Sequence, residues 1–394
     1  MLGAIIGDIV GSRFEFNPTN DYNFELFTDE CGFTDDTICT FAIAEAILNH
    51  KDYGESLHEW CRLYPHPKGS YGGRFAQWVH SESPQPYGSF GNGSAMRVSP
   101  VGWLNYSRTY ILNLAENTAV CTHNHPEGIK GAQIVALAIH VANAGRRCNQ
   151  TSTDIVKNII KECVEFSNYN INLRMEDVAN RFDETCQGTV PVALWIINQS
   201  NGFEDAIRRA VSLGADADTL GAIVGSIAEA IWGIPNIIKV KAISYLDDRM
   251  KNLLRKWRRS KLIKGINIKD FTEKYIDYFL NDFDHESSSY YDLFESSAFP
   301  HECWSLGFEM DCGQSIIEAY GEEAWKNERR LSEVIDKMND LRIMGSGLFS
   351  EWRYFNHWSW GHATEEDKQW FLMLLRRMRE LASCTNNNDT SVKL

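Results

Sequence analysis

The chain has 394 residues, of which 43% are hydrophobic and 23% are charged. This composition is ordinary for a globular protein with a sizeable buried core, and the length exceeds one average domain. The formal net charge of −14 at pH 7 argues against binding to nucleic acid or to an anionic membrane. An anionic small-molecule ligand would therefore need local donors or bound metal ions at its site.

The amino-terminal stretch MLGAIIGDIVG is apolar, but it lacks a basic segment and Asp8 interrupts it. We therefore expect no signal peptide. The sequence holds no run of about 18 apolar residues, which predicts that nothing spans a membrane. Ten cysteines are scattered without a CxxC pair, a pattern that favours reduced thiols and a cytoplasmic protein.

Helical periodicity dominates the first 255 residues and predicts an all-α fold. The amino-terminal segment has the small residues of a closely packed helix, followed by a loop. Further helices are predicted over residues 36–49, 128–144, 190–198, 203–213, 220–232 and 237–257. Gly221, Ala222, Gly225 and Ala228 give the 220–232 helix small faces, against which another helix could pack tightly.

The character of the sequence changes near residue 260, which predicts a boundary between a main domain at 1–258 and a smaller α or α+β domain at 259–394. Aromatic side chains gather at 290–299 and 352–360, and an amphipathic helix is predicted at 365–381. The aromatic residues could form the core of this second domain. They could also contact a protein partner, the role that we favour for the domain.

Two acidic clusters each precede an apolar helix: GFTDDT at 32–37 and GADADT at 214–219. Helix capping accounts for one Asp or Thr side chain at each helix start, but not for a second carboxylate. Together the clusters contribute four aspartates, which two divalent cations would neutralise. Such hard cations take oxygen ligands. The spacing alone leaves capping and a two-metal site equally open.

Three further segments carry polar groups suited to a ligand. The glycine-rich stretch YGSFGNGSAMR at 87–97 is either a simple turn or a loop whose backbone N–H groups cradle a diphosphate. In CTHNHPE at 121–127 the Cys and His residues lack the second ligand pair of a zinc site, so we expect a ligand contact or a helix cap. Glu15 is either a mobile acid–base group or a surface charge. The residues alone do not separate Asp8 from a structural role.

Taken in order, the segments GAIIGDIVGSRFEF, FTDDT, GSFGNGSAMR, THNHPEGIKGA and GADADTLGAIVG resemble the ADP-ribosylglycohydrolase family. This family includes the dinitrogenase-reductase activating enzymes, and the resemblance covers about residues 1–255. It implies an all-α orthogonal fold with two Mg²⁺ or Mn²⁺ ions at its centre.

The resemblance also implies roles for individual residues. The implied metal ligands are Thr34, Asp35, Asp36, Asp216, Asp218 and Thr219. The implied ligand-binding residues are Gly88, Ser89, Phe90, Gly91, Asn92 and Gly93 of the diphosphate loop, together with His123. Glu15 corresponds to a glutamate on a movable flap. The implied catalytic groups are Glu15 and the four aspartates, with Glu15 or an aspartate handling protons.

The resemblance predicts a hydrolase that removes ADP-ribose from a protein side chain or from a small acceptor. Its partner would be an ADP-ribosylated protein or an ADP-ribose-containing small molecule. Two alternatives remain: a binding or structural protein without turnover, and an immunity or regulatory protein that neutralises an ADP-ribosyltransferase. An arginine, serine or acyl-ester linkage is equally compatible with the sequence, and so are Mg²⁺ and Mn²⁺.

Overall fold

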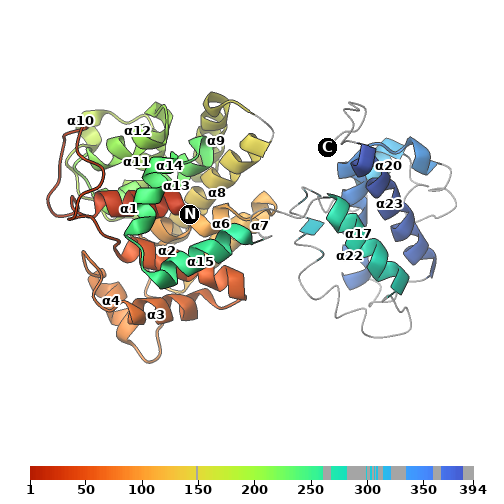
Figure 1. The fold of residues 1–394 in the computed structure, drawn as a ribbon, viewed down its shortest axis with the longest axis horizontal. Helices are drawn as coiled ribbons and strands as arrows, with labels where there is room; N and C mark the ends of the chain where they lie inside the picture. Colours follow the sequence, from red (N-terminus) through yellow and green to blue (C-terminus); the bar gives the residue numbers. More distant parts are fainter. Residues whose placement is uncertain are drawn as a thin grey trace. The chain divides into compact units, whose positions relative to one another are not determined.

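We describe the protein from a computed structural model (Figure 1). The structure describes residues 1–147, 150–260, 268–281, 299, 302–303, 306, 308, 314–320, 334–357 and 365–384. The chain divides into two compact units, Met1–Leu104 with Arg108–Ser260 and Asn105–Ser107 with Lys261–Leu394. All regular elements of the described residues are helices. The predicted all-α class is therefore confirmed.

The helices of the first unit are α1 (Leu2–Gly11), α2 (Asp35–Asn49), α3 (Tyr53–Leu63), α4 (Gly73–His80), α5 (Gly93–Arg97), α6 (Ser99–Gly102), α7 (Arg108–Val120), α8 (Pro126–Arg147), α9 (Ser152–Ser167), α10 (Met175–Val178), α11 (Cys186–Gln199), α12 (Phe203–Val211), α13 (Ala217–Trp232), α14 (Asn236–Ser244) and α15 (Asp248–Arg259). Most predicted helices are present, with ends displaced by four residues or fewer. The prediction of one helix over 237–257 is wrong. Asp247 accepts a hydrogen bond from the N–H of Met250 and so starts a second helix, α15.

Helices α1 and α13 pack backbone against backbone at the centre of this unit (Figure 1). Every residue of α1 is buried. A Cβ atom added to Gly7 would overlap the carbonyl group of Gly221, and one added to Gly3 would overlap that of Gly225. The predicted tight packing of the 220–232 helix is thus confirmed. Only glycine at these positions allows the two helix axes to come so close.

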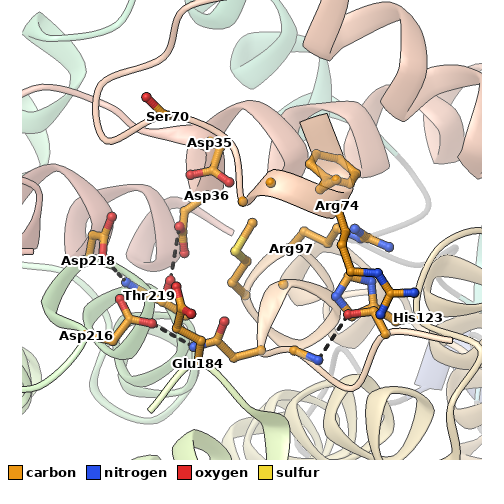
Figure 2. A pocket seen from close by; sticks show the side chains of 18 of the residues that line it. Asp35, Asp36, Ser70, Arg74, Arg97, His123, Glu184, Asp216, Asp218 and Thr219 are labelled. Carbon is orange, nitrogen blue, oxygen red and sulfur yellow. Dashed lines mark hydrogen bonds between the residues drawn. The ribbon is translucent and has the colours of Figure 1, made fainter. Parts of the chain in front are cut away.

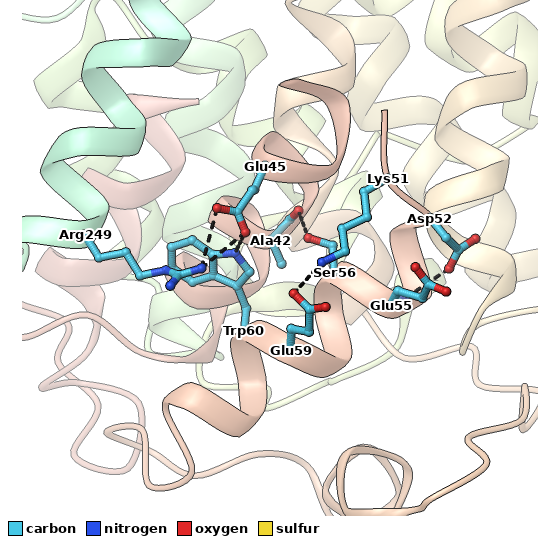
Figure 3. Close-up of polar contacts among 9 residues, drawn as sticks. All are labelled: Ala42, Glu45, Lys51, Asp52, Glu55, Ser56, Glu59, Trp60 and Arg249. Atoms are coloured by element: carbon cyan, nitrogen blue, oxygen red, sulfur yellow. Dashed lines mark hydrogen bonds and ion pairs between the residues drawn. The ribbon is translucent and has the colours of Figure 1, made fainter. Parts of the chain in front are cut away.

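Helix α3 is held on α2 by polar contacts around a buried tryptophan (Figure 3). The indole N–H of Trp60 donates to Glu45 at 2.6 Å, and the Ser56 hydroxyl donates to the Ala42 carbonyl at 2.7 Å. Arg249 of α15 lies over the Trp60 ring and pairs with Glu45 at 3.3 Å. These contacts fix α2, whose first turn carries an acidic cluster.

The second unit contains α17 (Ile268–Asn281), α20 (Gln314–Tyr320), the 3₁₀ helix η2 (Ile335–Lys337), α22 (Leu341–His357) and α23 (Glu365–Cys384). Its core is strongly aromatic, and its buried rings include Phe271, Tyr275, Phe299, Phe349 and Trp370. The buried aromatic side chains of this unit therefore form its core. Residues 290–298 and 358–360 of the predicted aromatic segments lie outside the described residues.

Across the described part of both units, no helix is long and apolar enough to cross a membrane.

The α1–α13 contact predicts that Gly7→Ala lowers the free energy of unfolding by about 2 kcal/mol, as overpacking does in a tight core. Alanine favours a helix over glycine by about 1 kcal/mol, so a loss would show that the overlap dominates. Chemical denaturation measures the change. Gly202→Ala is the control, because a Cβ at Gly202 has nothing within 4 Å. Equal stability of Gly7→Ala and wild type would contradict the close approach.

Candidate active site

A cavity of about 270 Å³ opens in the first unit, where several helices begin or end (Figure 2). Its lining includes Glu15, Asp35, Asp36, Ser89, Gly91, Asn92, Gly93, His123, Asp216, Asp218 and Thr219 from the sequence analysis. It also includes Tyr87 and Arg97, which begin and end the glycine-rich stretch, and Ser70, Arg74 and Glu184, which no sequence motif indicated. The two acidic clusters, some 180 residues apart in the chain, thus share one cavity.

Thr34, Gly88 and Phe90 do not line the cavity. Thr34 is fully buried behind it, as the N-cap of α2. Gly88 stands at the outer end of the glycine-rich loop, in the left-handed region at φ +66°. The Phe90 ring is 42% exposed and lies 5.2 Å from the His125 ring.

The acidic end of the cavity is built from the first turns of α2 and α13. The Thr34 hydroxyl accepts a hydrogen bond from the N–H of Asp36 at 3.2 Å, so capping explains this residue. The Thr219 hydroxyl donates to Asp36 Oδ2 at 3.3 Å and joins the two clusters. Capping does not explain Asp35, Asp36 and Asp216, because none of them caps its helix through its side chain.

Asp8, whose role the sequence left open, holds the start of α2 in place. Its carboxylate accepts hydrogen bonds from the Thr34 N–H at 3.0 Å, the Thr34 hydroxyl at 2.8 Å and the Thr37 N–H at 3.1 Å. Asp8 lies on α1, which packs on α13. It therefore ties the start of α2 to the helix pair that carries the second acidic cluster. A carboxylate in the middle of an apolar, small-residue helix was the signal in the sequence.

Burial and mutual repulsion disfavour the ionised form of these carboxylates. Burial and then the charge of Asp218 raise the pKa of Asp8 to about 7 and the pKa of Glu15 to about 8. The same two causes hold the pKa of Asp36 and the pKa of Asp216 well above the usual range. The charge of Asp218 thus raises the pKa of each of these carboxylates.

The acidic end fits divalent cations by its donor chemistry. Asp36 Oδ1 and Glu15 Oε2 are buried acceptors with no hydrogen-bond donor among the described residues. Buried, repelling carboxylates with free lone pairs are what hard cations stabilise. Within the described ranges, no three Asp, Glu, His or Cys side chains already converge as a complete coordination shell.

The opposite end of the cavity carries donors and positive charge, in Arg74, Arg97 and His123 (Figure 2). Arg97 is only 1% exposed. Its Nε finds no acceptor among the residues that the structure describes. Arg74 donates to the Tyr87 carbonyl and lies over the Tyr87 ring. Desolvation, followed by the charges of Arg97 and Arg74, lowers the pKa of His123 well below its usual range.

Several backbone N–H groups of the glycine-rich loop donate within the protein, and the role of the loop in holding a diphosphate stays a prediction. The N–H of Gly88 donates to Asn124, that of Gly91 to the Ser89 hydroxyl, and that of Asn92 to the Glu184 carbonyl. The Asn92 side chain donates to Asp216 at 2.8 Å. The loop therefore lines the cavity with Gly91 and Gly93, which have no side chains, and its Asn92 fixes the Asp216 carboxylate.

The two histidines of the 121–127 segment make separate ring contacts. The His123 ring lies against the glycine loop, whereas the His125 ring lies against Phe90.

Comparison with known proteins gives consistent matches. A family model described as ADP-ribosylglycohydrolase matches residues 1–268. The ADP-ribosylarginine hydrolase Tri1 of Pseudomonas putida (strain GB-1) is 26% identical over 266 residues, covering 59% of this chain and 70% of that protein. The ADP-ribosylhydrolase ARH3 of Danio rerio is 24% identical over 328 residues, covering 64% of this chain and 88% of that protein.

A solved structure described as an ADP-ribosylglycohydrolase-related protein complex aligns with a TM-score of 0.50 and 24% identity. The alignment covers 66% of this chain and 95% of that chain. It confirms the expected ADP-ribosylglycohydrolase-like fold.

The shared repulsion from Asp218 predicts that Asp218→Asn stabilises the metal-free protein. We expect the thermal midpoint in EDTA to rise by about 3 °C, the shift that about 1 kcal/mol produces in a domain of this size. Circular dichroism measures it. Asp21→Asn, at an exposed site, is the control and should leave the midpoint unchanged. A lower midpoint for Asp218→Asn would mean that the carboxylates are held by stabilising partners without metal.

Proposed function

The chain belongs to the ADP-ribosylglycohydrolase family, and we propose that it is a dinuclear-metal-dependent hydrolase that cleaves ADP-ribose from a modified protein side chain or a small acceptor. The single observation that carries the proposal is the meeting of both acidic clusters in one cavity, opposite Arg74, Arg97 and His123. A carboxylate end and a cationic end match the two ends of a substrate that joins a ribose to a diphosphate.

At the acidic end, oxygen atoms of Thr34, Asp35, Asp36, Asp216, Asp218 and Thr219 would hold two Mg²⁺ or Mn²⁺ ions. When bound, such ions neutralise the carboxylates, orient hydroxyl groups and lower the pKa of water. Asp8 and Asn92 would hold the two acidic clusters in position. Asp8 accepts a hydrogen bond from Thr34 of the first cluster, and Asn92 donates one to Asp216 of the second. Thr34 lies behind the cavity wall and accepts a hydrogen bond from the N–H of Asp36. It would therefore orient Asp36, in addition to giving an oxygen ligand to a metal ion.

Glu15 is the proposed proton-handling residue. It lines the cavity beside Asp218, and its carboxylate lies against the backbone of Gly69. The adjoining Ser70 also lines the cavity and has a left-handed backbone, with φ +76°. Departure of the acceptor builds positive charge on the ribose, as in other glycoside cleavages. The aspartates beside Glu15 would stabilise that charge electrostatically.

At the opposite end, the diphosphate would lie against Ser89, Gly91, Asn92 and Gly93. Since the backbone N–H groups there are largely used, Arg74, Arg97 and His123 would supply the attraction. Gly88 and Phe90 stand at the rim of this loop, and we propose that they contact the part of the ligand that extends from the cavity. We also propose residues 1–258 as the catalytic domain, because all these groups lie within them. Residues 259–394 would contact a protein partner.

The function is tested by incubating the full-length protein with arginine- and serine-ADP-ribosylated proteins and with O-acetyl-ADP-ribose. We expect release of ADP-ribose from at least one substrate, loss of that activity in EDTA, and recovery with Mg²⁺ or Mn²⁺. The substrate that is cleaved identifies the linkage. Binding of ADP-ribose without cleavage of any substrate would favour the alternative of a non-catalytic binding or immunity protein.

Asp36→Asn should abolish this cleavage and also the stabilisation that metal gives. At one hundred times its dissociation constant, a bound ion stabilises the wild type by about 2.7 kcal/mol. Thermal unfolding with and without Mg²⁺ measures this. Asp21→Asn should behave as wild type in both assays. Equal stabilisation of Asp36→Asn and wild type by Mg²⁺ would remove Asp36 from the metal site.

Gly91→Val should weaken binding of free ADP-ribose about tenfold, measured by calorimetry. A Cβ at Gly91 would lie 3.3 Å from Ser89 Oγ and 3.6 Å from His123 Nε2. The valine side chain would therefore occupy the surface on which the diphosphate is proposed to lie. Gly202→Val is the matched control, because Gly202 has open space around it. Unchanged affinity in a folded Gly91→Val variant would place the diphosphate elsewhere.

A further inference from the structure

A chain of buried hydrogen bonds runs from Arg97 to the ring of His123. Arg97 Nη2 donates to the Thr122 hydroxyl oxygen at 2.8 Å, and that oxygen lies 2.7 Å from His123 Nδ1. Arg97 also donates to the Thr118 carbonyl at 2.9 Å, which fixes the guanidinium group. Thr122 is fully buried, and His123 is only 5% exposed. Water therefore does not compete for these groups.

The direction of the second hydrogen bond follows from counting protons. A threonine hydroxyl has one proton to give and two lone pairs to receive. Arg97, always protonated, occupies one lone pair of Thr122. The Thr122 hydroxyl has two further partners among the described residues, His123 Nδ1 at 2.7 Å and the Cys121 thiol, and the ring nitrogen is much the stronger acceptor. Leaving a buried hydroxyl proton unpaired is costly, so the hydroxyl donates and Nδ1 accepts.

The other ring nitrogen then carries the proton and faces the cavity. His123 Nε2 lies 3.2 Å from the position of a Cβ on Gly93 and 3.6 Å from one on Gly91. His123 lines the cavity beside these glycines. The Thr122 carbonyl accepts hydrogen bonds from the N–H groups of Tyr87 and Ser89, both at 3.4 Å. The same residue thus orients the ring and anchors the loop that the ring faces.

We propose that Arg97 and Thr122 are positioning residues that lock His123 in its neutral form with the proton on Nε2. His123 would act only as a hydrogen-bond donor, never as a base, toward an acceptor oxygen in the cavity. The inference rests on the proposed function solely for the identity of that ligand, an oxygen of the ADP-ribose diphosphate or of an adjoining ribose.

The surroundings of His123 agree with a ring that stays neutral. The groups that face it are the Arg97 and Arg74 guanidinium groups and the Tyr87 ring, and among the described residues no carboxylate pairs with it. Desolvation and the two positive charges lower the pKa of His123. A cationic His123 would bind an anion more strongly, but the buried arginine already supplies that charge. The hydrogen bond from Thr122 to Nδ1 instead keeps the ring proton on Nε2, so the ring always donates from the same nitrogen.

The test uses full-length protein labelled with ¹⁵N in its histidine rings, with the His123 signals identified by their loss in His123→Gln. We expect the neutral Nε2–H pattern of ring shifts in wild type, unchanged as the pH falls through the range where ordinary histidines titrate. Thr122→Val should mix the two tautomers and weaken ADP-ribose binding about tenfold, as expected when a directed hydrogen bond to a charged partner is lost.

Two control variants distinguish the loss of the Arg97–Thr122–His123 hydrogen bonds from a loss of packing. Thr122→Ser keeps the hydroxyl and should keep both the tautomer and the affinity. Thr118→Val removes an equally buried hydroxyl that donates to the Ala115 carbonyl and does not touch His123. It should leave both unchanged. Circular dichroism checks that all variants are folded.

A wild-type His123 that is charged, or that carries its proton on Nδ1, would overturn the proposed positioning role of Thr122. A Thr122→Val variant that keeps one tautomer and full affinity would overturn it as well. The ring shifts are read without ligand, so they test this role whether or not ADP-ribose binds. Failure of wild type to bind ADP-ribose would instead overturn the proposed function.

Discussion

The backbone contact between α1 and α13 is the constraint on which the rest of the first unit depends. Glycines at Gly3 and Gly7 face Gly225 and Gly221, so the two helices approach more closely than side chains would allow. This contact brings the amino-terminal segment, with Asp8 and Glu15, next to the start of α13 with Asp216 and Asp218. Asp8 then binds the start of α2. The positions of these site residues therefore depend on a contact between two helices that lie more than 200 residues apart in sequence.

The cavity formed in this way separates charge. One end gathers carboxylates that burial and repulsion make unfavourable as isolated anions, and the other holds a buried arginine and a neutral histidine. Each end lacks something that a ligand would supply: cations at the first and acceptor oxygens at the second. The protein carries a net charge of −14, so under the proposed function an anionic substrate would depend on this local positive charge and on neutralisation of the acidic end.

Several site features were predictable because they are local in sequence. Paired aspartates at two helix starts exceed what capping requires, whereas the glycine-rich stretch alone did not separate a turn from a binding loop. The role of Asp8 was left open, since a charge in an apolar helix can be interpreted only once its partners are known. The loop was predicted to offer its backbone N–H groups, but Asn124, Ser89 and Glu184 take those of Gly88, Gly91 and Asn92. Two of these acceptors lie far from the loop in sequence.

Local sequence patterns predicted the helical class, the two acidic helix starts and the small-residue face of α13, because periodicity, composition and small residues act over one or two helical turns. The sequence also carried the ordered motifs that resemble the family. The tertiary structure alone decided which polar groups meet: Asp36 with Thr219, Asn92 with Asp216, and Arg97 with Thr122 and His123. It likewise decided that the described aromatic residues of the second unit form its core. Hydrogen-bond partners and burial depend on chain segments that only packing brings together, and no local pattern encodes them.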